Sequence, residues 1–508
     1  MAPLRGRAGM ALLALAGGLA QAASIANPWN GAPLWWLQLL SVALLAGLLD
    51  RSASVRQAVA LGWIFSSAWL SGTFWWLFIS MHTYGGLAAP LAALAVLGLA
   101  AFLGSYYAVL SGVFRAFAPA ATALRALFFG ALWLLAELLR GSWFTGFPWG
   151  AGGYAHLDGA AGWAARWVGV YGLGAAAAAL AAALAFAVLH RRMAVAAAVV
   201  VVTVAASLAP AAPATGRDVG APLPVALLQG NIPQDEKFQP GSGVPLALQW
   251  YAEQLRDNRA RLVVAPETAL PLLPQDLPPG YLDALQARFA TGDQAALVGI
   301  PLGDARAGYS NSALGFRPGQ PPYRYDKHHL VPFGEFIPPL FRWFVRMMHI
   351  PLGDFHRGAV GQPTFDWQGQ RLAPHICYED LFGDEMAAQF HDPATAPTLL
   401  VNLSNIGWFG DSVAIDQHLG ISRMRTLEFE RPMLRATNTG ATVVIDHRGR
   451  VTASLEPLTR DVLRAEVQGR DGITPYAAWV ARFGLAPLWV LALGGLLAGV
   501  AAGLRRRR

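Results

Sequence analysis

Long apolar runs, separated by short polar loops, occupy the first 213 residues of the chain and return near its C-terminus. A helix needs about 20 apolar residues, within a range of roughly 17–25, to cross a lipid bilayer. By this measure the sequence predicts eight membrane spans, at residues 9–24, 34–49, 57–79, 87–114, 123–139, 162–189, 193–213 and 485–503. The pattern is typical of a multi-pass α-helical membrane bundle.

The pattern changes between residues 220 and 472, where charges become frequent and short β-branched runs alternate with helical stretches. Strands are predicted at residues 225–229, 261–265, 296–300, 312–316, 374–377, 398–403, 433–437 and 442–446. Helices are predicted at residues 243–259, 280–291 and 413–430. This alternation predicts an α/β domain.

The chain therefore divides into four predicted parts. Residues 1–213 form an N-terminal transmembrane bundle of seven spans, and residues 214–219 form a linker. Residues 220–472 form the α/β domain, which is long enough to bury its own core. Residues 473–508 hold the final span and a basic tail.

Composition supports a membrane protein and excludes other classes. Hydrophobic residues make up 55% of the chain and charged residues only 14%, against about 25% charged residues in a typical soluble domain. These values exclude an entirely soluble protein, a disordered chain and a nucleic-acid binder that relies on charge. The net charge of +7 comes from basic residues that stand between apolar runs, which indicates membrane orientation instead.

The basic residues predict which side each loop faces. If the N-terminus is cytoplasmic, alternate loops carry paired arginines, and the loops around 25–33 and 80–86 carry no Lys or Arg. We therefore expect both termini in the cytoplasm and residues 214–484 outside, in the periplasm of a bacterium with two membranes. The first apolar run also fits a signal peptide, and that alternative stays open.

Three polar segments of the α/β domain carry candidate chemistry. Glu267 directly follows a predicted strand, Lys327 lies in a dense polar and aromatic stretch, and Cys377, the only cysteine, ends another strand. A thiol is a useful nucleophile only when deprotonated, so it needs a base nearby, here Glu267. Lys327 and the backbone N–H of Tyr378 would stabilise a tetrahedral oxyanion. This set predicts acyl transfer through a thioester.

Each of these residues alone also has a structural explanation. A lone cysteine at a strand end is often a buried hydrophobe, and a lone Glu or Lys is usually on the surface. The sequence contains no P-loop, no dinucleotide fingerprint and no cysteine pair. His328 and His329 lack the further ligands that a metal needs. We therefore expect neither a cofactor nor a metal.

At the same residues the chain resembles a known family. The order Glu–Lys–Cys resembles the nitrilase superfamily of thiol amidases. The flanking motifs are narrower and resemble the apolipoprotein N-acyltransferases, as does a nitrilase-like domain placed before the last of eight spans. These motifs lie at residues 145–149, 229–234, 327–336, 376–379, 408–410 and 435–440.

The resemblance implies a four-layer α-β-β-α sandwich on a membrane bundle of the bacterial inner membrane. It also implies a ping-pong reaction, the last step of lipoprotein maturation. An acyl chain leaves the sn-1 position of a phospholipid, commonly phosphatidylethanolamine, and forms a thioester on the cysteine. The acceptor is the α-amino group of the S-diacylglyceryl cysteine at the start of an apolipoprotein. We expect a monomer that binds no nucleic acid.

The resemblance also assigns roles by position. Glu267 is the general base, Lys327 stabilises the oxyanion and Cys377 is the nucleophile. The supporting residues are Glu335, Tyr378 and Glu379.

Three positions depart from the family pattern. Ala265 stands where the base motif commonly has Trp, Ile406 follows Asn405 where Asp is common, and Phe238 occupies a position that often holds Trp. None of these changes removes a catalytic atom. They bear on the shape of the substrate pocket.

Two further segments are candidate substrate contacts. The apolar stretch 336–351 is expected to be a mobile lid at the membrane interface, with a core helix as the alternative. Its lid residues are Trp343, Phe344, Met347 and Met348.

The second segment is the loop 141–157. Trp149 in this loop suits the interfacial aromatic belt, or the floor of a binding site above the membrane. Glu137 and Arg140, three apart on the preceding helix, are placed to pair.

Two rivals to the transferase remain at this stage. A membrane-tethered amidase or nitrilase-type hydrolase would use the same three residues, with water as the second nucleophile. A scaffold or transporter without enzymatic activity is the other. The complete Glu–Lys–Cys set disfavours it, as does the scarcity of charge within the spans.

Overall fold

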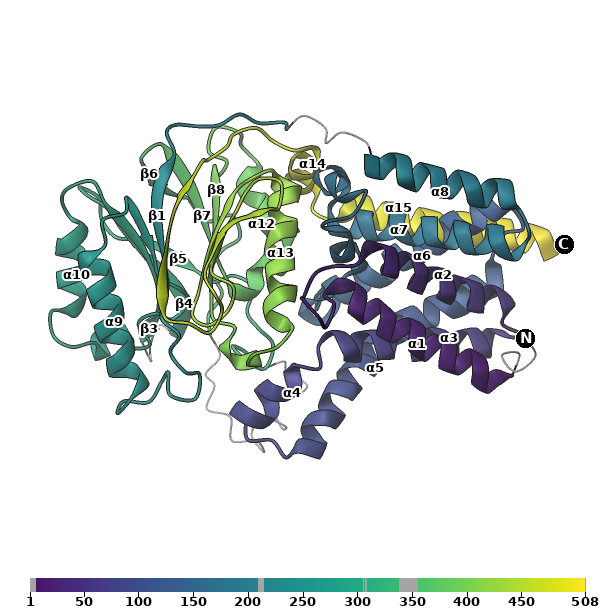
Figure 1. Ribbon diagram of the computed structural model, residues 1–508, viewed down its shortest axis with the longest axis horizontal. Helices are drawn as coiled ribbons and strands as arrows, with labels where there is room; N and C mark the ends of the chain where they lie inside the picture. The colour runs from purple at the N-terminus through teal and green to yellow at the C-terminus, as the bar shows by residue number, and fades with distance from the viewer. Residues whose placement is uncertain (1–5, 209–213, 305, 307, 338–354, 508) are drawn as a thin grey trace. The chain divides into compact units, whose positions relative to one another are not determined.

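The computed structural model describes residues 6–208, 214–304, 306, 308–337 and 355–507. Contacts within the chain divide it into two compact units. Unit 1 comprises Met1–Phe78, Ala88–Pro213 and Phe483–Arg508, and unit 2 comprises Ile79–Leu87 and Ala214–Arg482. Figure 1 labels the elements of both units.

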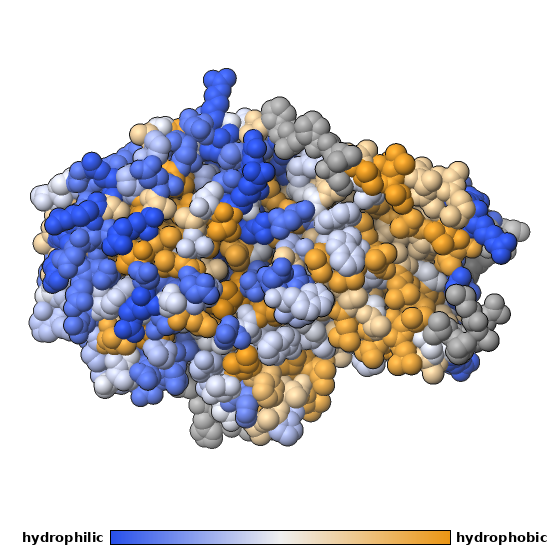
Figure 2. Space-filling model, viewed as in Figure 1, coloured by the Kyte–Doolittle hydropathy of each residue, from blue (hydrophilic) through white to orange (hydrophobic). Residues whose placement is uncertain are grey.

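Unit 1 is built of helices, and a helix lies at each of the eight places where the sequence predicts a span. Figure 2 shows hydrophobic side chains gathered over these helices, and residues such as Leu94 and Leu497 are well exposed on them. Outward apolar side chains are what a bilayer requires of a spanning helix. The helices are α1 (Arg7–Ile25), α2 (Trp35–Arg51), α3 (Val55–Thr73), α5 (Ala89–Phe117), α6 (Thr122–Ser142), α7 (Ala165–Leu189), α8 (Met193–Leu208) and α15 (Ala486–Arg507).

By length and composition, the described helices support most of the eight predicted spans. Among the described residues, five helical stretches are long and apolar enough to cross a membrane, or six if one bent pair counts as a span. Helix α2 has 17 residues, at the lower end of the range for a span, and the described part of α8 has 16. The span predicted at 57–79 is not one straight helix. Helix α3 ends at Thr73, and the following segment Leu77–Tyr84 is bent from it by 63°.

Small residues let the helices of unit 1 approach closely. A Cβ on Gly62 of α3 would lie 2.2 Å from the Ser111 hydroxyl oxygen of α5. Such contacts are how helices associate where the surrounding lipid is as apolar as the side chains.

The loop after α6 is held by two buried ionisable side chains of that helix. Glu137 accepts a hydrogen bond from the Gly152 N–H at 2.7 Å, and Arg140 donates to the carbonyls of Phe147 and Trp149 at 2.7 and 2.8 Å. Within the described part of the chain no ion pair joins Glu137 to Arg140, so the predicted pairing is replaced by separate bonds to one loop.

Trp149 itself is buried within unit 1. It is 2% exposed, and its ring centroid lies 4.7 Å from that of Trp76. This placement differs from the exposed belt position considered for it, because the loop folds inward under its hydrogen bonds. Trp143, by contrast, is 55% exposed.

Unit 2 contains two six-stranded sheets. The first has the strand order β12-β1-β2-β3-β4-β5, and the second has the order β11-β10-β9-β8-β7-β6. Strands of the first sheet are β1 (Leu223–Gln229), β2 (Leu262–Val264), β3 (Ala295–Asp304), β4 (Gly308–Phe316), β5 (Tyr323–Asp326) and β12 (Asp461–Val467). Strands of the second are β6 (Phe365–Trp367), β7 (Gln370–Ile376), β8 (Leu399–Ser404), β9 (Met433–Thr437), β10 (Val443–Ile445) and β11 (Val451–Ser454).

Alternating side chains along the strands build the layers of unit 2. Successive residues of a strand point to opposite faces. Ala226 and Leu228 of β1 therefore pack with the helical layer of α9 (Gly243–Asp257) and α10 (Tyr281–Phe289). Val225 and Leu227 point the other way, into a core shared with the second sheet.

Helices α12 (Gly383–Ala387) and α13 (Ala414–Phe429) lie against the second sheet (Figure 1). The predicted α-β-β-α sandwich is thus confirmed. Helix α14 (Pro475–Phe483) follows the last strand.

The segment predicted as a linker, 214–219, is bound to unit 2. The Thr215 N–H donates to a Glu430 carboxylate oxygen at 2.6 Å, and the Val219 N–H donates to the Gly469 carbonyl at 2.9 Å. The four predicted lid residues between 343 and 348 lie outside the described residues.

Candidate active site

Cys377 directly follows β7, at the carboxyl end of an interior strand of the second sheet, next to the edge strand β6. Its φ angle is +52°, in the left-handed region that non-glycine residues rarely occupy. Burial, and after it the Glu267 carboxylate, raises the pKa of the thiol to about 12, while the Lys327 ammonium opposes this rise. The resting side chain is therefore a thiol that needs a base.

Glu267 lies just beyond the end of β2, three residues after Val264. One carboxylate oxygen accepts the Asn405 N–H at 2.8 Å, and the other accepts the Asn311 side-chain amide at 2.7 Å. Neighbouring β3 approaches this turn so closely that a Cβ on Gly299 would lie 2.2 Å from the Pro266 carbonyl oxygen. The carboxylate is therefore held in one orientation by donors from separate elements.

Lys327 directly follows β5 and connects two carboxylates. Its Nζ lies 2.9 Å from a Glu335 oxygen and 3.4 Å from a Glu267 oxygen, and its side chain is only 1% exposed. Burial opposes the charge on this ammonium, but Glu335 and Glu267 outweigh burial and raise the pKa of Lys327 above its usual range. The site thus holds a permanent cation.

Glu335 supports both partners from the loop after β5. The Asn311 amide that bonds Glu267 also bonds Glu335 at 2.7 Å, and the Val331 N–H donates to the second Glu335 oxygen at 2.8 Å. Because a buried charge needs partners that satisfy it, Glu335 balances Lys327 and leaves Glu267 less tightly paired.

Glu379 connects the cysteine strand to the lysine loop. One of its oxygens accepts the His328 N–H at 2.7 Å, and the other accepts the Ile376 N–H at 2.6 Å and the Tyr325 hydroxyl at 2.9 Å. The predicted supporting role of Glu379 therefore has a physical basis in unit 2. Tyr378 packs its ring near Phe382, with centroids 5.3 Å apart. The oxyanion role of its backbone N–H stays a prediction.

Glu379 leads to a pH-dependence prediction. Burial raises the pKa of this carboxyl from 4.5 to about 7, against the hydrogen bonds it accepts. Between these values the folded protein holds a proton that the unfolded chain has lost, so stability from this group falls as pH rises. The shift is worth about 3 kcal/mol.

We expect the stability of wild type relative to Glu379→Gln to fall as pH is raised from about 5 to about 8, because the variant has no carboxyl at this position to lose a proton. Thermal unfolding midpoints across that range check this, with the exposed Glu466→Gln as control. A wild-type stability that stays constant relative to the variant, or rises relative to it with pH, would contradict the raised pKa.

Residues that the sequence interpretation missed complete the site. Asn311 bridges the two carboxylates, and Lys237 donates from Nζ to the Glu267 carbonyl at 3.1 Å with its side chain 1% exposed. One signal was present in the sequence: Lys237 and Lys327 are its only lysines. Phe238, predicted as a substrate contact, is 50% exposed beside Lys237.

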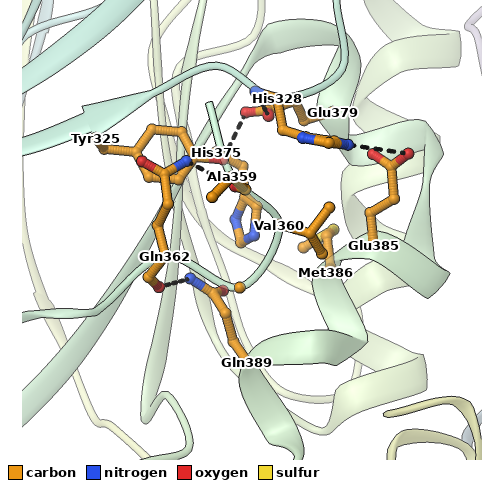
Figure 3. Close-up of a pocket in the computed structure, with 11 residues that line it drawn as sticks. Tyr325, His328, Ala359, Val360, Gln362, His375, Glu379, Glu385, Met386 and Gln389 are labelled. Atoms are coloured by element: carbon orange, nitrogen blue, oxygen red, sulfur yellow. Dashed lines mark hydrogen bonds and ion pairs between the residues drawn. The ribbon is translucent and has the colours of Figure 1, made fainter. Parts of the chain in front are cut away.

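Glu379 also lines a pocket, and Cys377 is not among the residues that line it. Figure 3 shows Glu379 bonded to His328 at its edge, with Glu385 and His375 facing the same space. Burial lowers the pKa of His375 to about 4, so this ring is neutral. Among the described residues, no group of three or more His, Cys, Asp or Glu side chains is placed to hold a metal ion.

The arrangement supplies the parts of nucleophilic catalysis. It has a thiol at a strand end, a carboxylate held by N–H donors and a buried ammonium, and these come from the ends of β7, β2 and β5. A carboxylate can take the thiol proton, and an ammonium in a site shielded from water stabilises developing negative charge.

Both units match families of known proteins. Residues 17–183 match the family described as apolipoprotein N-acyltransferase N-terminal domain, and residues 224–474 match the family described as carbon-nitrogen hydrolase. Among solved structures, a carbon-nitrogen hydrolase from Helicobacter pylori G27 aligns with 53% of this chain and with 94% of the hydrolase chain, at 15% identity and a TM-score of 0.36.

Curated relatives match nearly the whole chain. An apolipoprotein N-acyltransferase of Verminephrobacter eiseniae (strain EF01-2) is 61% identical, covering 93% of this chain and 92% of its own. One from Ralstonia nicotianae (strain ATCC BAA-1114 / GMI1000) is 46% identical, covering 98% and 93%. The chain therefore belongs to the apolipoprotein N-acyltransferase family and is an acyltransferase with a domain of the nitrilase superfamily.

Proposed function

We propose that this protein moves a fatty acyl chain from a phospholipid to the α-amino group of an apolipoprotein's N-terminal S-diacylglyceryl cysteine. The observation that carries the proposal is the meeting of Glu267, Lys327 and Cys377 in a chain whose other unit is built of apolar helices. Both substrates are anchored in lipid. A catalytic domain joined to membrane helices lets their acyl chains remain largely in hydrocarbon while the sn-1 ester and the α-amine react.

In the first half-reaction Glu267 takes the Sγ proton of Cys377, and the thiolate attacks the sn-1 ester carbonyl of the phospholipid. The carbonyl π electrons move to oxygen, where Lys327 and the Tyr378 N–H stabilise the oxyanion. The oxyanion collapses and the carbon–oxygen bond to the glycerol breaks. Protonated Glu267 returns its proton to the leaving alkoxide, which leaves as a lysophospholipid, and the acyl group stays on sulfur as a thioester.

In the second half-reaction the neutral α-amine of the acceptor attacks the thioester carbonyl. Glu267 takes one proton from the attacking nitrogen, and collapse of the oxyanion breaks the carbon–sulfur bond. The products are an amide on the apolipoprotein and a Cys377 thiolate, which regains its proton from Glu267. One acid–base group therefore serves both halves, as a ping-pong mechanism needs.

Exposed aromatic side chains adjoin the site residues in sequence and support a lipid substrate. Phe238 follows Lys237, Phe333 lies two residues before Glu335, and Trp408 lies three after Asn405; they are 50%, 40% and 38% exposed. Apolar side chains that reach the surface near the site can bury part of an acyl chain away from water.

The setting that goes with this function is the bacterial inner membrane. We propose that the catalytic domain, residues 220–472, lies on the periplasmic side and that both termini lie in the cytoplasm. The alternation of loops with and without basic residues supports this orientation. Phosphatidylethanolamine is the donor we favour, on the family resemblance, and we expect the protein to act as a monomer. The four residues Trp343, Phe344, Met347 and Met348 are our candidates for a lid, and Trp149 for a further substrate contact.

Mass spectrometry of the purified protein tests this proposal. After incubation with phosphatidylethanolamine and no acceptor, we expect a hydroxylamine-sensitive fatty-acyl adduct on Cys377, and none on a Cys377→Ser variant. A diacylglyceryl-cysteine peptide should then discharge the adduct and appear N-acylated. An adduct that water discharges as fast as the peptide would indicate the hydrolase instead. A folded protein without any adduct would reject the thioester route.

A further inference from the structure

The backbone carbonyl of Cys377 is held by two buried side chains. The Asn402 side-chain amide donates to it at 3.2 Å, and His418 Nε2 lies 3.2 Å from it. Asn402 lies on β8, the parallel neighbour of β7, and His418 lies on α13. Both side chains are at most 1% exposed, so neither contact is open to competition from solvent.

One arginine fixes the orientation of both side chains. Arg435 donates from Nη2 to His418 Nδ1 at 2.9 Å and from Nη1 to the Asn402 side-chain oxygen at 3.1 Å. A guanidinium has donors only. His418 Nδ1 must therefore accept, which puts its proton on Nε2 toward the Cys377 carbonyl. By the same argument the Asn402 NH₂ group faces that carbonyl.

The charge state of the histidine agrees with this assignment. Burial, and after it the Arg435 charge, lowers the pKa of His418 well below its usual value, and Lys327 acts in the same direction. Arg435 is itself balanced by Asp380, 3.4 Å away, and it donates to the Ser422 hydroxyl at 2.7 Å. His418 is thus a fixed neutral donor.

Asn402 and His418 together form a clamp on the Cys377 carbonyl. The clamp therefore acts on the residue that carries the nucleophile, whose backbone is strained. A left-handed φ in a non-glycine residue costs about 1–2 kcal/mol and persists only where its surroundings enforce it. The Cys377 carbonyl and the Tyr378 N–H belong to one planar trans peptide, so they point in opposite directions. Holding the carbonyl toward Asn402 and His418 therefore aims the N–H at the other side of the peptide. Hydrogen bonds to a peptide carbonyl also polarise its N–H into a stronger donor.

We propose that Asn402 and His418, oriented by Arg435, are positioning residues that aim the Tyr378 N–H at the oxyanion of the reacting carbonyl. They touch neither the acyl group nor the thiol and act through the Cys377 peptide. The inference deepens the proposed function and rests on its thioester step.

The test compares two reactions of Cys377 in the purified full-length protein. Acylation by p-nitrophenyl butyrate passes through an oxyanion, and release of nitrophenol reports its rate. Alkylation by iodoacetamide attacks a tetrahedral carbon and forms no oxyanion. We expect His418→Leu and Asn402→Ala to slow acylation by about 10- to 100-fold, below the full loss of an oxyanion donor, and to change alkylation by less than about threefold.

His418→Gln supplies the rescue, because its amide nitrogen can donate to the same carbonyl. It should recover most of the acylation rate, and the exposed His391→Leu serves as the matched control. If acylation and alkylation fall together, or acylation does not fall, the positioning role is wrong. If His418→Leu does not fold, the acylation and alkylation rates of Asn402→Ala and His418→Gln decide whether the positioning role is correct.

The two proposals fail in different ways. If the wild type accepts butyryl groups from the nitrophenyl ester but no acyl group from phospholipid, the proposed function is contradicted. The ratio of the acylation rate to the alkylation rate still tests the positioning role of Asn402 and His418.

Discussion

Replacing Glu267 with glutamine is expected to lower the rate of thioester formation by about 10²- to 10⁴-fold, the usual contribution of a general base. Burial, and after it the Glu267 carboxylate, raises the pKa of the Cys377 thiol to about 12, so the thiol is protonated at neutral pH and must lose its proton to a base. An amide cannot take the thiol proton. Its NH₂ group would also face either the Asn405 N–H or the Asn311 amide, which are both donors.

The measurement is the single-turnover rate of the fatty-acyl adduct on Cys377, with Glu466→Gln as the exposed control. Because hydroxide replaces the missing base, the residual rate of Glu267→Gln should rise with pH more steeply than that of wild type. A variant with the wild-type rate would show that the proton leaves the thiol by another route.

Replacing Lys327 with methionine is expected to damage both stability and activity. The change leaves Glu267 and Glu335 buried beside each other without the cation that lies 3.4 and 2.9 Å from them. Removing one partner of a buried ion pair destabilises a protein by about 3–5 kcal/mol, because the remaining charge is uncompensated. Thioester formation should fall by at least about 10²-fold through loss of oxyanion stabilisation.

A double variant separates the two effects of Lys327. Lys327→Met with Glu335→Gln removes one charge of each sign, so the unfolding midpoint should recover toward that of wild type. Activity should not recover, because the cation facing the oxyanion is still absent. Thermal unfolding and the adduct rate measure both, with the exposed Arg464→Met as control. Recovery of both properties would make Lys327 a structural residue only.

The strands that the sequence could and could not predict differ in a physical way. All eight predicted strands occur, because strands such as β1 and β8 are buried almost throughout and mostly apolar. Four were missed: β5, β6, β11 and β12. β5 and β6 contain charged residues, β11 is mostly exposed, and β12 mixes charged with apolar residues. These four form the edges of the two sheets, where one side of a strand lacks a partner and local hydrophobicity is weak.

The site divides in the same way. Glu267, Lys327 and Cys377 could be found because their residue types and flanking motifs are local features of the sequence. Asn311 and His418 could not, since an asparagine within a strand and a histidine within a helix carry no local sign of function. Their roles arise from contacts with residues 44 and 41 positions away.

The sequence by itself determined the apolar helices, the alternating core of the sandwich and the chemistry of the reacting groups, because hydrophobic period and side-chain type act over a few residues. Only the tertiary structure decided the bend after Thr73, the burial of Trp149 and the hydrogen bonds that orient Glu267 and the Cys377 peptide. Those depend on which strands and helices become neighbours. Pairing between distant segments is set by packing the whole core, and no local pattern encodes it.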